Sequence, residues 1–167
     1  MQDLQATFTR DFMLLILLGA SNTLPIVARI LMKRRFDTPV DFNMPFPDGR
    51  PVFGPHKTWR GIAASLSGTG ILSWMLGVGL LTGIKLAFFS MAGDLLSSFI
   101  KRRMNLKSGA RATGIDQAIE AFLPLAVMKG QLGISWTECF GITILFTVLE
   151  IILSPIFYRL GFRRHPY

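Results

Sequence analysis

The sequence has little of the side-chain chemistry that soluble enzymes commonly use. It contains one cysteine, Cys139, and two histidines that lie far apart, His56 and His165. One cysteine excludes an internal disulfide, and so sparse a set disfavours a Cys/His zinc site. Charged residues are also scarce at 17% of the chain, whereas about 25% is usual in soluble domains. A soluble globular protein is therefore not the expected class.

Apolar residues make up half of the 167 residues, and the mean hydropathy is +0.44. The net charge of +8 would suggest nucleic-acid binding in a soluble protein. In an apolar chain, the same positive charge is expected in loops beside membrane helices. There it sets the orientation of the helices and binds anionic lipid headgroups. We therefore predict a membrane protein that does not bind nucleic acid.

Five apolar runs predict an all-α, polytopic protein with a single transmembrane domain over residues 1–167. Two of the runs carry one carboxylate each, Asp94 and Glu150, and the fourth run is interrupted by Glu120, Pro124 and Lys129. The length needed to cross a hydrocarbon core is about 20 residues per helix. The predicted spans are residues 12–28, 61–84, 86–100, 116–136 and 139–158.

The first run has an alternative interpretation as a signal peptide, because residues 12–18 form a short apolar stretch followed by small residues. Signal peptides begin with a positively charged segment. Here the leader holds Asp3, Arg10 and Asp11, which give a net negative charge. We therefore favour an integral helix.

The basic residues predict the orientation of these spans. Fourteen of the 18 Lys and Arg residues fall in a proline-rich loop at 33–60, a basic loop at 101–115 and the C-terminal tail. The other side holds Arg10, Lys85 and Lys129. Because basic loops stay in the cytoplasm, we expect an outside N-terminus and a cytoplasmic C-terminus in the plasma membrane. A loop as long as 33–60 is often functional.

Asp94 is the first candidate site residue. A carboxylate within an apolar helix is costly unless it faces a polar cavity, binds a cation or pairs with another group. Helical spacing places Ser98 and Lys101 on the same face as Asp94. The alternative is a structural role, in which Asp94 bonds a neighbouring serine or pairs with Arg29.

Two further stretches lie on the predicted cytoplasmic side. Asp116 and Glu120 are one helical turn apart, although an acid in a first turn is also favoured by the helix dipole. The segment 57–61 places Trp59 between cations, which is equally typical of a membrane-interface anchor. Carboxylates are ligands for Mg²⁺, and Lys and Arg bind phosphates. Together the three stretches predict a metal and polyphosphate site at the inner interface.

Short motifs over residues 41–124 carry a more specific signal. They are Asp41-Phe42, Asp48-Gly49-Arg50, the string GPHKTWRG at 54–61, Gly93-Asp94 with SFIKRR at 98–103, and Asp116-Gln117 with Pro124. In order and spacing they resemble the integral-membrane CTP transferases that make CDP-lipids, especially the short CDP-archaeol synthase branch. That family often has a second aspartate three residues after the first, whereas Glu120 lies four residues after Asp116. The role of Glu120 as a metal ligand is therefore left open.

The resemblance implies a cytidylyltransferase in which CTP and a phosphatidic-acid-like or archaetidic-acid-like lipid phosphate give a CDP-lipid and pyrophosphate. The lipid phosphate can itself attack the α-phosphorus, so no protein nucleophile is required. The resemblance implies Asp94 and Asp116 as Mg²⁺ ligands, with Lys101 as a third catalytic residue. The substrate-binding residues would be Lys57, Thr58, Trp59, Arg60, Ser98 and Arg102.

Two other classes of function remain open on the sequence alone. An ion or small-solute transporter could use the intramembrane carboxylates Asp94 and Glu150. A lipid-binding scaffold could use the polybasic loops. We expect Arg29, Glu150 and Trp74 to be structural. The expected partners are CTP, a lipid phosphate and membrane lipids, and the sequence leaves a homo-oligomer open.

Overall fold

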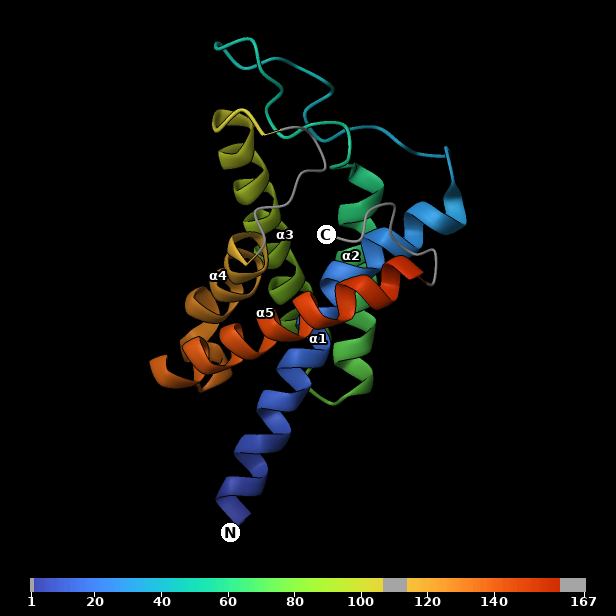
Figure 1. The fold of residues 1–167 in the computed structure, drawn as a ribbon. Helices are drawn as coiled ribbons and strands as arrows, with labels where there is room; N and C mark the ends of the chain where they lie inside the picture. The colour runs from blue at the N-terminus through green and yellow to red at the C-terminus, as the bar shows by residue number, and fades with distance from the viewer. Residues whose placement is uncertain (1, 107–113, 160–167) are drawn as a thin grey trace.

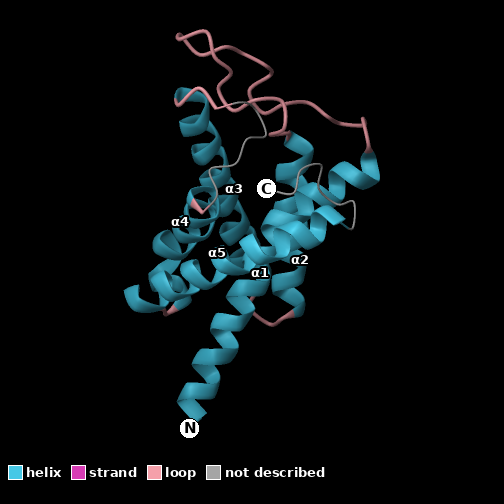
Figure 2. Ribbon diagram, viewed as in Figure 1, coloured by secondary structure: helices cyan, strands magenta, loops and turns pink. Residues whose placement is uncertain are grey.

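The computed structural model describes residues 2–106 and 114–159, which form five helices (Figures 1 and 2). The all-α class is thereby confirmed. Lys107 and Arg111 of the basic loop lie outside the described residues, as does the tail at 160–167. The helices are α1 (Gln2–Met32), α2 (Trp59–Met75), α3 (Leu80–Arg103), α4 (Ile115–Leu132) and α5 (Trp136–Arg159).

Three of the helices are long and apolar enough to cross a membrane. These candidate spans are Gln5–Met32 in α1, Leu80–Arg103 in α3 and Trp136–Ser154 in α5. α2 has 17 residues, which is short for a span, and α4 contains three charged residues along its 18. Membrane crossing by α2 and α4, and the orientation of the bundle, stay predictions.

The first four helices run alternately between two ends of the molecule (Figure 1). One end, here called the loop end, contains the loop 33–58, the last turn of α3 and the first turn of α4. The other, called the turn end, contains the short connections 76–79 and 133–135. The described residues of the two loops that are predicted to share one side of the membrane therefore lie at the same end.

The predicted span at 61–84 is wrong, because a turn divides it. α2 ends at Met75 and α3 begins at Leu80. Gly77 and Gly79 have φ values of 77° and 103° in the connection, a backbone region that glycine adopts without strain. The turn carries no charge, so hydropathy alone could not reveal it. These two glycines therefore form the turn between α2 and α3.

Close contacts between small residues join the first three helices. A Cβ added to Gly68 in α2 would lie 2.6 Å from Leu24 Cδ1 in α1. In the bundle interior Ser21 donates to Ser90 Oγ at 3.0 Å, and Ser65 donates to the Ser21 carbonyl oxygen at 2.8 Å. These buried hydroxyls connect α1, α2 and α3 where a lipid environment offers no competing water.

The apolar core lies around the middle of α1. Leu14, Leu17 and Leu18 are buried there together with Leu86 of α3 and Leu125 of α4. The central position of these α1 leucines favours the integral-helix interpretation over a cleaved leader.

Candidate active site

Two ion pairs lie at the loop end and bring together all three predicted stretches. Lys57 Nζ, just before α2, donates to both carboxylate oxygens of Asp94 at 2.5 and 2.6 Å. Lys101 Nζ on α3 donates to Asp116 Oδ2 at the start of α4 at 2.6 Å. The side chains are 25% and 19% exposed in the first pair and 11% and 9% in the second. Both pairs are thus partly withdrawn from solvent, which strengthens their attraction.

Glycine allows α3 and α4 to approach closely beside this cluster. A Cβ added to Gly93 would lie 2.8 Å from the carbonyl oxygen of Ile119 and 3.1 Å from Glu120 Cα. The same approach brings the carboxyl group of Glu120 close enough to Asp94 for the two groups to interact electrostatically. Three acidic side chains, from Asp94, Asp116 and Glu120, therefore belong to one electrostatic cluster with Lys57 and Lys101.

The start of α4, where Asp116 lies, is fixed by the residues next to it. Gly114 has a φ of 93° and its backbone N–H donates to Gln117 Oε1 at 2.9 Å. This bond closes the first turn of α4 on itself. Gln117 is buried, as is Asp116. The two residues of the motif therefore have different roles: Asp116 supplies a carboxylate to the site, and Gln117 caps the helix that carries it.

The proline-rich loop 33–58 folds around the side chain of Asp41. Its Oδ2 accepts from the backbone N–H groups of Phe53 at 2.8 Å and Gly54 at 2.9 Å, and its Oδ1 accepts from Asn43 N at 3.1 Å. Burial works to raise the pKa of Asp41, but these backbone donors outweigh it and hold the pKa below its usual value. One carboxylate thus organises the backbone of the loop.

The loop is attached to the last turn of α3 through Arg103. The Arg103 guanidinium donates to Asp48 Oδ1 at 2.7 Å and to the Pro51 carbonyl oxygen at 2.6 Å. It also lies over the rings of Phe46 and Phe99, at 4.6 and 5.0 Å from their centroids. Such cation–π contacts add to the hydrogen bonds. The loop and the helix that carries Asp94 are therefore mechanically connected.

The other residues predicted from the segment 57–61 have mainly local contacts. Thr58 accepts from the Gly61 N–H at 3.2 Å and so caps α2. Trp59 is half exposed. Arg60 is buried, and it binds the loop through two backbone carbonyls and one carboxylate, those of Lys33, Arg35 and Asp37. The structure brings Lys57 to the carboxylates, while Thr58 and Arg60 fasten the loop to α2.

Ser98 and Arg102 lie on α3 one and two turns after Asp94. Both side chains are buried. Arg102 interacts electrostatically with Asp116, so the predicted phosphate-binding cation is close to the second carboxylate.

The electrostatic field of the cluster keeps Lys57 charged. Burial works to lower the pKa of Lys57, but the surrounding carboxylates, Asp94 foremost, together outweigh it and raise the pKa above the ordinary value. Glu120 and Asp116 act in the same direction. A permanently cationic group is what binding a polyphosphate requires.

Within residues 2–106 and 114–159, no three His, Cys, Asp or Glu side chains form a ready-made metal cage. Mg²⁺ in proteins commonly keeps several waters and binds one or two carboxylates together with substrate phosphates. The oxygen donors of Asp94 and Asp116 fit that kind of site.

Sequence reasoning missed the anchoring role of Asp41, Asp48 and Arg103. Each belongs to one of the short motifs over residues 41–124, but the motifs alone assign it no function. One sequence feature could have indicated this role. The loop 33–58 contains acidic residues and glycines, and the last turn of α3 contains several basic residues with which those acids could pair.

Comparison with known proteins identifies the family to which this arrangement belongs. The family model described as CarS-like CDP-archaeol synthase matches residues 14–167. The chain belongs to the CDP-archaeol synthase family. The CDP-archaeol synthase of Sulfurisphaera tokodaii is 36% identical over an alignment of 138 residues, and the match covers 78% of this chain and 82% of that protein. The CDP-archaeol synthase of Archaeoglobus fulgidus is 32% identical over 156 residues, covering 78% and 84% of the two chains.

A solved structure supports the same family. It is described as "Structural insight into an intramembrane enzyme for archaeal membrane lipids biosynthesis", and it matches with a TM-score of 0.66 and 25% identity. The match covers 82% of this chain and 90% of that chain. The predicted resemblance to CDP-archaeol synthases and the predicted multi-pass membrane architecture are both confirmed. Membership of an enzyme family favours the transferase over the transporter and the scaffold.

Proposed function

We propose that this member of the CDP-archaeol synthase family transfers the cytidylyl group of CTP to an archaetidic-acid-like lipid phosphate. Family membership supports a CTP-using transferase that makes a CDP-lipid, and the names of the relatives favour the archaeal lipid over phosphatidic acid. The observation that carries the proposal is the pairing of Lys57 with Asp94 and of Lys101 with Asp116 at one end of the bundle. Such a site offers both cations and carboxylates to a metal-bound polyphosphate.

In the proposed reaction an oxygen of the lipid phosphate attacks the α-phosphorus of CTP. The new bond joins the lipid phosphate to the cytidylyl group, the bond between the α-phosphorus and the α,β-bridging oxygen breaks, and pyrophosphate leaves with those electrons. The attacking oxygen is already anionic, so the protein must mainly align the two phosphates and neutralise charge on the leaving group.

The chain's own residues divide these tasks. Asp94 and Asp116 would hold Mg²⁺, which supplies Lewis-acid neutralisation of phosphate oxygens when bound. Lys57 and Lys101 would turn from the carboxylates to the phosphates of CTP, and Arg102 would stabilise the departing pyrophosphate. Ser98 would orient a phosphate oxygen. Arg60, fastened to the loop backbone, would position Lys57 through the adjacent residues.

The loop 33–58 would cover the nucleotide from the aqueous side. It is attached to α3 through Arg103 and organised by Asp41, and it carries Lys57 at its end. The lipid phosphate would arrive from the adjoining leaflet of the cell membrane. With the predicted orientation, this site faces the cytoplasm, where CTP is available.

The proposal is tested with the purified full-length chain, CTP, Mg²⁺ and either a diether or a diester lipid phosphate. Release of pyrophosphate with the diether lipid is expected, and Asp94→Asn or Asp116→Asn should lower turnover by roughly a hundredfold or more. Asp11→Asn, at the turn end, is the matched control and should keep wild-type turnover. Wild-type turnover by both site variants would refute the site, and CTP-independent solute flux in vesicles would favour the transporter.

A further inference from the structure

A groove at the turn end lies away from the candidate active site. It is a space of about 390 Å³ between α2, α3 and α4. Apolar side chains such as Leu66, Phe88 and Val127 form its walls, and Lys85 and Gln131 lie at its polar rim. Phe88 and Val127 are each more than half exposed. The volume is within the range of small-molecule sites, about 300–1,000 Å³.

The rim of this groove offers a cation and an amide to a ligand. The exposed Lys85 donates to Gln131 Oε1 at 3.3 Å, and Gln131 Nε2 donates to Thr82 Oγ1 at 3.2 Å. This 3.3 Å contact joins two exposed polar groups, and no carboxylate in the described part of the chain forms an ion pair with Lys85. An anion at the rim would therefore gain a favourable contact with this ammonium group.

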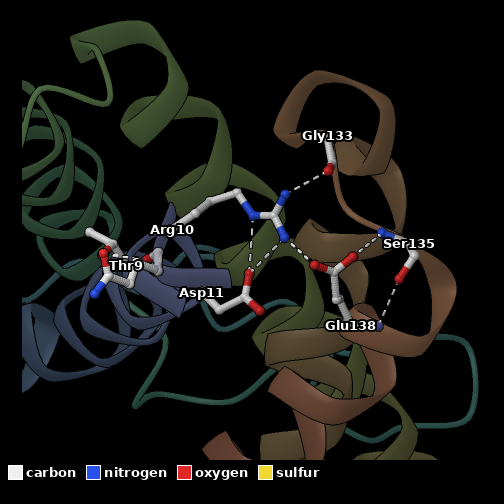
Figure 3. Close-up of polar contacts among 7 residues, drawn as sticks. Thr9, Arg10, Asp11, Gly133, Ser135 and Glu138 are labelled. Carbon is white, nitrogen blue, oxygen red and sulfur yellow. Dashed lines mark hydrogen bonds and ion pairs between the residues drawn. The ribbon is translucent and has the colours of Figure 1, made fainter. Parts of the chain in front are cut away.

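A neighbouring cavity of about 440 Å³ shares Gln131 but does not offer the same chemistry. Its cation, Arg10, is engaged on three sides (Figure 3). It donates to Asp11 Oδ1 at 3.1 Å, to the Gly133 carbonyl oxygen at 2.7 Å and to the Glu138 carboxylate. This network fastens α1 to the connection between α4 and α5. Of the two cations, Lys85 is therefore the one that is better able to bind an anion in this region.

We propose that the groove binds an anionic membrane phospholipid, with the phosphate on Lys85 and Gln131 and one hydrocarbon chain along Phe88 and Val127. The occupant is a lipid because a single cation at a polar rim adjoins exposed apolar walls on helices that include a candidate membrane span. The charge of Lys85 complements the phosphate, and the walls complement the chain.

The bound lipid is not the reacting lipid. Lys85 and Lys101 are separated by about 24 Å along α3, at 1.5 Å per residue. The hydrocarbon core of a bilayer is about 30 Å thick, so the two lysines lie near opposite interfaces. A lipid whose phosphate binds Lys85 therefore lies in the leaflet opposite the candidate active site. There it would contact α2, α3 and α4 at the turn end.

The test uses the delipidated full-length protein in detergent, without CTP. Binding of dioleoyl phosphatidylglycerol and dioleoyl phosphatidylcholine is measured by native mass spectrometry. The wild type should retain one phosphatidylglycerol molecule in preference to phosphatidylcholine. Lys85→Gln should weaken that binding by about five- to tenfold, as for one lysine near an anionic headgroup. Lys129→Gln removes a charge from the same end, at a residue that lies over the Trp136 ring, and should leave binding unchanged.

A second variant tests the apolar part of the groove. Val127→Trp should fill it and lower binding of both lipids. Equal affinities of the wild type and Lys85→Gln for phosphatidylglycerol, or equal affinities of the wild type for the two lipids, would overturn the proposal. If Val127→Trp does not fold, as judged by its melting temperature, the lysine comparison still decides. Because CTP is absent, the result does not depend on the proposed reaction.

Discussion

The ammonium group of Lys57 lies between the two carboxylate oxygens of Asp94, 2.5 and 2.6 Å from them. A cation in this position competes with a metal ion for the same oxygens. Binding of Mg²⁺ at Asp94 therefore requires Lys57 to move, and a polyphosphate gives its ammonium group a new anionic partner. The arrangement predicts that metal and nucleotide bind much better together than separately.

Lys57→Met should raise the affinity for a divalent cation in the absence of CTP. The variant removes the competing cation, so we expect Mn²⁺ to bind about tenfold more tightly, which corresponds to about 1.4 kcal/mol. The Michaelis constant for CTP should rise at the same time. Electron paramagnetic resonance of free Mn²⁺ measures the first effect. The control is Lys33→Met, which removes a lysine charge elsewhere in the loop and should change neither the Mn²⁺ affinity nor the Michaelis constant for CTP. An unchanged Mn²⁺ affinity of Lys57→Met would show that Lys57 does not compete with the metal ion for Asp94.

The ion pair should also withstand alkaline conditions. The pKa of Lys57 is raised above its ordinary value of 10.5, so its stabilising contribution is complete below that value. It is lost only as the pH rises through the higher pKa of the folded protein. We therefore expect the alkaline decline in the melting temperature of the metal- and nucleotide-free protein, from about pH 8 to about pH 10, to be the same in the wild type and in Lys57→Arg. A decline present in the wild type alone would contradict this expectation.

Gly93→Ala should separate α3 from α4 and damage the site. The added methyl group would meet the backbone of Ile119 and Glu120, and backbone cannot move aside as a flexible side chain can. We expect a loss of about 1–3 kcal/mol in stability, typical of overpacking, and a turnover reduced by at least about tenfold. Melting temperature and pyrophosphate release measure the two effects. Gly130→Ala in α4, which meets no atom within 4 Å, is the control and should be neutral.

Asp41→Asn should loosen the loop 33–58. The substitution removes the charge and one of two accepting oxygens, and a hydrogen bond to a charged group contributes about 1.5–3 kcal/mol. Amide exchange at Phe53 and Gly54 should become at least about tenfold faster. Since the pKa of Asp41 is lowered, wild-type protection should be complete above the ordinary value of 3.8 and fall only below it. Protection that declines between pH 7 and 5 would contradict this assignment.

Arg103→Lys should weaken the attachment of the loop while keeping the charge. Lysine cannot donate to Asp48 and Pro51 with a planar fork or stack on Phe46. We expect the Michaelis constant for CTP to rise several-fold with a smaller change in turnover number. Arg34→Lys, at an exposed loop position, is the matched control. A fall in turnover number with an unchanged Michaelis constant would indicate direct participation of Arg103 in the reaction.

Glu120→Gln should lower turnover less than Asp94→Asn does. Glu120 lies close to Asp94, but no lysine in the described part of the chain forms an ion pair with it, and glutamine keeps a hydrogen-bonding group at this position. Steady-state pyrophosphate release from the two variants decides the matter. A loss equal to that of Asp94→Asn would make Glu120 a further ligand of the metal.

Local patterns predicted much of the fold and the meeting of three site stretches. Uncharged runs located the helices, and the distribution of basic residues predicted that the loops 33–60 and 101–115 share one side, which agrees with where their described residues lie. The break at 76–79 was missed because it is made by glycine conformation and carries no change in polarity. The length of α1 was underestimated because charged residues such as Arg10 and Arg29 end an apolar run without ending a helix.

Side-chain partners across the fold could not be predicted from spacing. The resemblance implies Arg60 as a substrate-binding residue, but spacing gave no sign that the loop before it would place the Lys33 and Arg35 carbonyl oxygens and the Asp37 carboxylate on its guanidinium. Likewise, no pattern indicates that Arg103 would reach Asp48, because a contact between residues 55 positions apart depends on the path of the whole loop. These contacts follow from tertiary packing, which a single sequence does not encode in its periodicity.

The buried hydroxyls of Ser21, Ser65 and Ser90 have a consequence for the depth of the site. In hydrocarbon, sliding one helix past another would strand these groups without hydrogen-bond partners, which is more costly than the same slip in water. The serines therefore fix the axial register of the first three helices. That register sets Lys57 and Asp94 at one level, so the proposed reaction at the loop end depends on alcohol groups in the interior of the bundle.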